Sequence, residues 1–210
     1  MAICPCISGS VLPEVPNATG CAIDFGQIQK IVFQRIFSSG TTENKFTSTT
    51  PIGTLTSWST FFSATDGTKM VITPYVENPT ADGGDPITYG GGNDTLGGET
   101  KITGRNPINM TFAMRQIPQS IAKALKALTC ENALGVYLIN NENQILAIKG
   151  STTGDYSPIP IRNVFVSDLK LMGLETPDEN TLQFSFAPNW SDDVEIVTPD
   201  FKPLTQLANA

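Results

Sequence analysis

The clearest signal in the chain is an alternation of apolar and polar side chains, which recurs in short segments along most of the sequence. Every second residue is apolar from Ile108 to Met114 and again from Leu182 to Phe186. Successive side chains of a strand point to opposite faces, so this period of two predicts strands with one buried face. Segments rich in β-branched and aromatic residues predict further strands at 26–37, 69–75, 133–139, 144–150, 161–173 and 193–199.

A different spacing predicts two helices. In the range 118–130 the apolar residues fall on one stripe, with Lys123 and Lys126 opposite and Pro118 suited to the first turn. A shorter helix is expected at 55–65, where Leu55, Trp58 and Phe62 share one face.

Polar turns of hairpin length, such as 140–143, separate neighbouring strands and exclude a parallel α/β sheet. The expected fold is therefore mainly β: an antiparallel β-sandwich or partly closed barrel of about seven to nine strands, flanked by the helix at 118–130. We expect residues 1–210 to form a single domain with an N-terminal arm at 1–21 and a C-terminal tail at 199–210. The tail carries Phe201, Leu204 and Leu207 without an obvious partner in its own sequence.

A glycine-rich stretch at 76–100 interrupts the β pattern. It contains seven glycines and five acidic residues but no basic residue. Such a composition cannot bury enough apolar surface to order itself, and long loops in compact domains are usually functional or disordered. We expect a long loop that is either mobile or held by something outside its own domain.

Charge and composition exclude several functions. The net charge is −7 and the 13 basic residues are scattered, whereas nucleic-acid readers carry a basic stripe. The chain has no histidine, which excludes Ser–His and Cys–His nucleophile systems. Asp192 and Asp193 are adjacent and do not converge, so we interpret them as a solvated turn and predict that the protein is not an enzyme.

Four cysteines, Cys4, Cys6, Cys21 and Cys130, leave three interpretations open: free thiols, a metal site or a disulfide. Calcium binding by Asp82, Asp85 and Asp94 is conceivable, but EF-hand spacing is absent. We predict no metal and no cofactor. The N-terminus lacks the features of a secretory signal, and no segment reaches the length of a membrane helix, so no membrane anchor is expected.

The order of elements resembles the tail tube proteins of long-tailed phages, which are related to type VI secretion tube proteins. The resemblance covers about two thirds of the chain. Its closest part is the C-terminal half: ALGVYLINNENQILAIKG, IPIRNVFVSDLKLMG and NTLQFSFAPNWSDD look like tube proteins of phages that infect Bacteroidetes-type hosts. The segment SWSTFFSATDGTKMVITPYV shares the likeness, whereas the cysteine-bearing N-terminus and the 76–100 loop do not.

This resemblance implies a structural virion protein, assembled in the host cytoplasm, that forms hexameric rings stacked into a tail tube. DNA would pass through the tube without stable binding, along a neutral to negative pore. Tape-measure, terminator and baseplate proteins are the partners that the resemblance implies. We expect subunit contacts in the long loop and the tail, at Tyr75, Pro79, Tyr89, Leu96, Phe201 and Leu204.

Two alternatives remain. The chain could be another virion component, such as a tail terminator, baseplate or capsid-decoration protein. It could also be a β-sandwich that binds carbohydrate or protein, with an aromatic platform made by Trp58, Trp190, Tyr75 and Tyr89.

Overall fold

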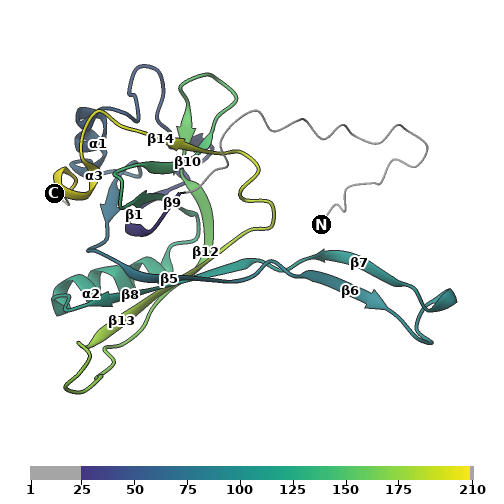
Figure 1. Cartoon of the computed structure of the whole chain (residues 1–210). Helices are drawn as coiled ribbons and strands as arrows, with labels where there is room; N and C mark the ends of the chain where they lie inside the picture. Colours follow the sequence, from purple (N-terminus) through teal and green to yellow (C-terminus); the bar gives the residue numbers. More distant parts are fainter. Residues whose placement is uncertain (1–24, 209–210) are drawn as a thin grey trace. The chain divides into compact units, whose positions relative to one another are not determined.

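The computed structural model describes residues 25–208, which fold as a mainly β protein with antiparallel sheets (Figure 1). The predicted fold class is confirmed. The strands are β1 (Ile28–Arg35), β2 (Phe37–Ser39), β3 (Thr42–Glu43), β4 (Met70–Ile72), β5 (Glu77–Gly83), β6 (Pro86–Gly90), β7 (Thr100–Arg105), β8 (Ile108–Arg115), β9 (Leu134–Asn140), β10 (Ile145–Lys149), β11 (Tyr156–Ser157), β12 (Ile159–Val166), β13 (Glu179–Phe186) and β14 (Val194–Val197). The helices are α1 (Leu55–Phe62), α2 (Gln119–Ala127) and α3 (Pro203–Gln206), with 3-10 turns at Leu96–Gly98 and Leu128–Cys130.

The described residues form two compact units. The larger, which we call the core unit, comprises residues 25–83 and 107–208. Residues 84–106 belong to the other, which we call the hairpin unit, and contain the β6–β7 pair. The division differs from the expected single domain, because the inserted segment makes its strand pairs within itself.

Strands β1 and β9 form the centre of the core unit and are buried on both faces. Ile31 and Phe33 point into one cluster, whereas Val32, between them, points into the other. Strand β9 shares this property, and all seven of its residues are buried. The pair therefore separates two hydrophobic cores, a pattern that strand alternation produces when both faces of a sheet are covered.

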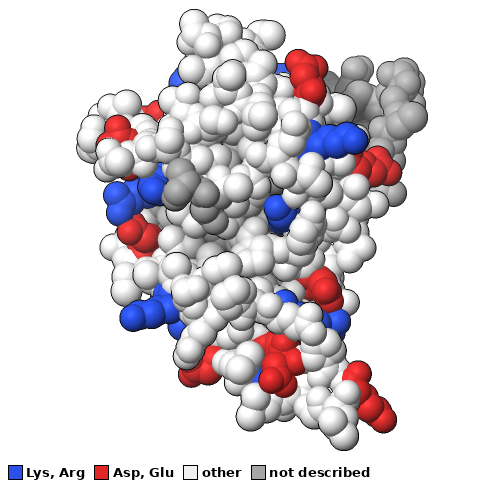
Figure 2. All heavy atoms as spheres, turned by 90° about the vertical axis from the view of Figure 1, so that its left-hand side faces the viewer, with Lys and Arg blue, Asp and Glu red and all other residues white. Residues whose placement is uncertain are grey.

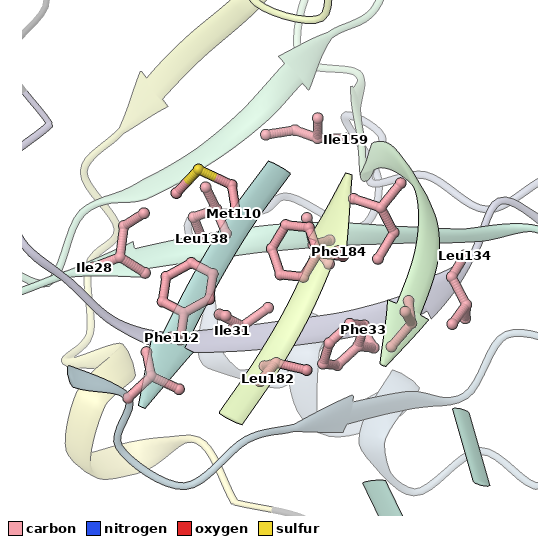
Figure 3. Packing of buried hydrophobic residues seen from close by; sticks show 14 of the residues in the cluster. Ile28, Ile31, Phe33, Met110, Phe112, Leu134, Leu138, Ile159, Leu182 and Phe184 are labelled. Carbon is pink, nitrogen blue, oxygen red and sulfur yellow. The ribbon is translucent and has the colours of Figure 1, made fainter. Parts of the chain in front are cut away.

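The first core lies between two layers of strands. One layer contains β1, β9 and β10, and the other contains β5, β8 and β13. Figure 3 shows Phe33, Phe112 and Phe184 pointing toward one another between these layers. The rings of Phe112 and Phe184 stack at a centroid distance of 5.6 Å, and Phe33 meets Phe184 edge-on at 6.4 Å. Helix α2 contributes the buried Leu125 to the same core.

Strand β12 connects the two layers. Its start pairs with β9 through Ile159 and Pro160, and its later residues pair with β13, with a register shift between Arg162 and Phe165. A shift of this kind bends a strand and lets it pass from one sheet to another. The arrangement is the sandwich-like packing that the sequence predicts.

The second core lies on the other face of β1 and β9, beneath α1 and α3. Trp58 is completely buried there, and its indole Nε1 donates a 2.7 Å hydrogen bond to the carbonyl of Ile52. Phe46 packs against Trp58 at 4.7 Å and against Tyr137 at 5.5 Å. Both helices predicted from spacing are therefore confirmed, because each carries a stripe that one of the two cores buries.

Three expectations about local structure are wrong. The range 76–100 is not an unstructured loop, because β5 pairs with β8, and β6 pairs with β7 in the hairpin unit. The strand predicted at 161–173 ends at Val166. The tail expected at 199–210 has a partner within the chain: α3 buries Leu204, and Leu207 follows it into the second core. The expected arm at 1–21, with Cys4, Cys6 and Cys21, lies outside the described residues.

Candidate functional site

Most of the large apolar side chains that remain exposed lie in two segments, one in each unit. We call Ile87, Tyr89, Leu96 and Ile102 the hairpin surface; Ile87 and Tyr89 share one face of the hairpin, whereas Ile102 stands opposite Thr88 on the other face. The 165–174 surface consists of Phe165, Leu169, Leu171, Met172 and Leu174. A concentration of large exposed apolar side chains is typical of interaction sites. These two surfaces are the strongest functional features among the described residues.

The hairpin surface belongs to a segment that buries none of its own side chains. No residue from 84 to 106 is buried, and Leu96 is fully exposed at the end of the hairpin. In the β6–β7 register, Tyr89 pairs with Lys101 and Ile87 pairs with Gly104. The side chain of Ile87 lies over Gly104, which has no side chain of its own. An isolated two-stranded hairpin is marginally stable in water. A partner that covers Ile87 and Tyr89 would supply the missing apolar contact.

The 165–174 surface occupies the end of β12 and the connection between β12 and β13 in the core unit. Backbone hydrogen bonds in both directions join Lys170 to Glu179, at 2.8 and 3.2 Å. Above this bridge the amide of Met172 donates to Oδ1 of Asp178 at 3.0 Å. The apolar side chains are thus presented by a connection that its own hydrogen bonds hold in shape.

Strand β5 is the outer strand of its layer and pairs with β8 alone among the described strands. Asn78 has a φ of 48°, and the pairing register shifts between Glu77 and Thr80. Pro79 at this irregularity offers no amide hydrogen. A bulge and a proline are typical protection for a sheet edge against unwanted pairing.

An ion-pair network crosses one end of this layer. Arg115 contacts Glu77 of β5 at 2.7 Å and Glu179 of β13 at 3.7 Å, and Lys170 lies 3.9 Å from Glu179. Arg115 and Glu179 are also direct partners in the β8–β13 register. The network joins three neighbouring strands and the base of the 165–174 surface.

The six sequence-predicted contact residues do not form one site. Tyr89 and Leu96 are exposed on the hairpin surface, and Pro79 is half-buried in β5. Tyr75 is exposed on the core unit, with Nζ of Lys30 4.8 Å from its ring centre, and burial lowers the pKa of that lysine. Phe201 and Leu204 pack into the second core. For Leu204 the expectation of an exposed subunit contact is wrong, because the side chain is 8% exposed.

The sequence reasoning missed the 165–174 surface. The sequence predicts one long strand over 161–173 and a turn from Leu174 to Asn180, so these apolar residues were not expected to be an exposed surface. Gly173 and the polar run from Glu175 to Asn180 indicate only the turn before β13, and residues 167–172 contain no glycine or proline that would mark the earlier end of the strand at Val166.

In the part of the chain that the structure describes, no group of three or more Cys, Asp or Glu side chains is placed to hold a metal ion. Cys130 is exposed and unpaired. Asp192 and Asp193 are exposed in the turn before β14, as interpreted from the sequence.

Charged residues are sparse and scattered on the face of the molecule shown in Figure 2. Lys and Arg alternate with Asp and Glu there, separated by uncharged residues. No basic patch forms on this face, and non-specific binding of nucleic acids depends on basic side chains that neutralise phosphates. Among residues 25–208, the helices are too short to cross a lipid bilayer.

Neither a scan against protein-family models nor a search of the curated proteins finds a match to this chain.

Proposed function

We propose that the protein is a structural subunit that assembles with copies of itself. The observation that carries this proposal is the segment 84–106, which exposes Ile87, Tyr89, Leu96 and Ile102 and in which no residue is buried. Such a segment gains stability only when another surface covers it.

The specific assembly that we propose is a phage-type tail tube, built from stacked hexameric rings. The support is the sequence resemblance together with a mainly β, antiparallel core unit that carries one flanking amphipathic helix. A contact between two different surfaces of identical subunits closes into a ring or continues as a filament. The absence of a basic patch on the face in Figure 2 suits a conduit through which DNA slides without binding.

The test is electron microscopy of the purified full chain in negative stain, over a range of concentrations. Stacked rings or tubes are the expected result. A double substitution of exposed hairpin residues, Ile87→Ser with Tyr89→Ser, should abolish stacking while leaving the thermal unfolding of the core unit unchanged. A matched control, Thr88→Ser with Thr103→Ser, should assemble like the parent chain. Particles that stay small and monodisperse at every concentration contradict the proposal.

Among the alternatives, a terminator, baseplate or decoration protein would give closed rings or single particles without stacking in the same images. A carbohydrate platform has less support, because Trp58 is completely buried in the second core and Trp190 lies stacked on Phe186 at 4.2 Å. These two indoles are used in packing within the core unit.

A further inference from the structure

A groove on the core unit combines an apolar lining with charged side chains around it. It has a volume of about 220 Å³ and lies where β1, β4, the start of β9 and the end of α2 meet. Its apolar lining comes from Phe33, Val71, Leu128 and Leu134, and charged side chains stand around it. Val71 and Leu128 are only half-buried, so an incoming side chain can still gain contact with them.

The 165–174 surface supplies an apolar segment of this kind in a fixed shape. Leu171 is 80% exposed and Leu174 is fully exposed, three residues apart on either side of Gly173. The Lys170–Glu179 bridge and the Met172–Asp178 hydrogen bond hold the connection from below. A segment that is already ordered loses less conformational entropy when it binds.

The charged side chains that have neither an ion pair nor a hydrogen bond are opposite in sign on the two surfaces. At the groove, Arg35 forms a two-pronged ion pair with Glu131 at 2.7 and 2.8 Å, and Asp66 accepts hydrogen bonds from Thr68. Within residues 25–208, this leaves Lys69 as the charged side chain at the groove that has neither an ion pair nor a hydrogen bond. On the other surface, Asp168 is paired with Lys126, Lys170 lies near Glu179, and Asp178 is hydrogen-bonded. The remaining charge there is Glu175, which directly follows Leu174 and is exposed.

We infer that Leu171 and Leu174 of one copy enter the groove of a second copy, with Glu175 of the first against Lys69 of the second. The contact joins two different surfaces of identical chains, so each copy can bind one neighbour through its groove and another through its 165–174 surface. The inference rests on the proposed self-assembly, and it assigns the residues of one contact within it. Apolar anchors with a complementary charge at the rim are the usual composition of a specific interface.

A charge-reversal experiment tests the pairing. Sedimentation velocity of the full chain over a concentration series gives the apparent dissociation constant for association. Glu175→Lys and Lys69→Glu alone should each raise this constant by about tenfold or more, and the double reversal in one chain should restore it to within about threefold. Glu142→Lys and Lys123→Glu, which make the same charge changes at exposed positions elsewhere, should have no effect. Single reversals that behave like these controls overturn the inference.

A mixing experiment tests the direction of the contact. One variant loses the anchors (Leu171→Ser with Leu174→Ser) and another loses the groove lining (Val71→Ser with Leu128→Ser). The far-ultraviolet circular dichroism of each should match that of the parent chain. Neither should associate alone through this contact, whereas an equimolar mixture should form a dimer, because one intact anchor meets one intact groove. If the mixture forms no dimer, or if each variant still associates like the parent chain, the inference is wrong.

The two experiments separate this contact from the proposed function. If stacked rings form and every variant assembles like the parent chain, the self-assembly stands and this contact fails. If the mixture dimerises but the parent chain never forms rings or tubes, the contact stands and the tail tube proposal fails.

Discussion

The hydroxyl of Tyr75 donates a hydrogen bond of 3.2 Å to the backbone carbonyl of Leu204, which joins the segment before β5 to the C-terminal helix. A second contact holds the same helix, because the amide of Leu204 donates to Oδ1 of Asn143 at 3.3 Å. Beneath these bonds, Leu204 and Leu207 complete the second core. The C-terminal segment is therefore an integral part of the core unit.

Removing this packing should destabilise the protein. Leu207 is 3% exposed, so Leu207→Ala should lower the free energy of unfolding by about 2–5 kcal/mol, through lost apolar burial and a residual cavity. Thr205→Ala, on the exposed side of the same helix, should change it by less than about 0.5 kcal/mol. Urea denaturation followed by tryptophan fluorescence measures both. Equal stability of the two variants would show that the tail does not pack as described.

Trp58 should be intolerant even of a conservative change. Trp58→Phe removes the indole donor and leaves the buried carbonyl of Ile52 without its 2.7 Å hydrogen bond, besides opening space beside Phe46. A buried acceptor that loses its partner costs about 1–3 kcal/mol. Phe61→Leu, at the partly exposed side of α1, is the matched control and should cost less. Differential scanning calorimetry should show the larger drop in melting temperature for Trp58→Phe, and the reverse order would refute this account of the second core.

Gly67 should accept no side chain. A Cβ at this position would lie 2.0 Å from the backbone carbonyl oxygen of Ser38, and the carbonyl of Gly67 itself accepts a 2.9 Å hydrogen bond from the side chain of Asn44. Gly67→Ala must therefore push apart two backbone segments, at a cost of about 1–3 kcal/mol. Gly53→Ala meets nothing within 4 Å and serves as the control. The melting temperatures of the two variants test this expectation: that of Gly67→Ala should fall and that of Gly53→Ala should not. An unchanged melting temperature for Gly67→Ala would contradict the described packing.

The ion pair between Arg35 and Glu131 should make a small part of the stability depend on pH. The hydrogen bonds from Arg35 hold the pKa of Glu131 below its ordinary value of 4.5. A carboxyl whose pKa is depressed by folding contributes stability above its unfolded pKa, and this contribution is lost as the pH falls through its folded pKa. The pair is largely solvent-exposed, so the contribution is about 1 kcal/mol or less.

Melting temperatures of the parent chain and Glu131→Gln, measured from pH 7 to pH 3, check this expectation. The parent chain should be more stable by up to about 4 °C at pH 7, and the difference should shrink below pH 4.5. Glu142→Gln, at an exposed position outside any described ion pair, should show no such convergence. A difference that stays constant over the whole range would mean that the pair does not stabilise the fold.

Much of the fold could be predicted because its signals are local. The alternation from Ile108 to Met114 appears directly as the burial pattern of β8, with Met110, Phe112 and Met114 buried. The stripe that ends at Leu128 predicted α2 for the same reason, since each pattern needs only the geometry of its own element.

Features that depend on distant partners could not be predicted. Strand β5 looks like a loop in sequence because Asn78, Pro79 and Gly83 have low strand propensity, and only its pairing with β8 makes it a strand. Leu171 and Leu204 look alike in sequence, yet one is exposed and the other is buried. The difference arises from Asn143 and Tyr75, which hold Leu204 and are far from it in the chain. For the same reason, the groove and the 165–174 surface had no local signature.

The double burial of β1 and β9 has a consequence for cooperativity. Val32 and Phe33 are neighbours in the chain but face different cores, and each stands opposite a buried residue of β9, Tyr137 and Val136 respectively. Disruption of the packing in either cluster therefore displaces the backbone of β1 and β9, which carries the side chains of the other cluster as well. The core unit should therefore unfold in one cooperative transition. A substitution that destabilises the second core beneath α1 should also lower the stability of the first core, including the stacked rings of Phe112 and Phe184.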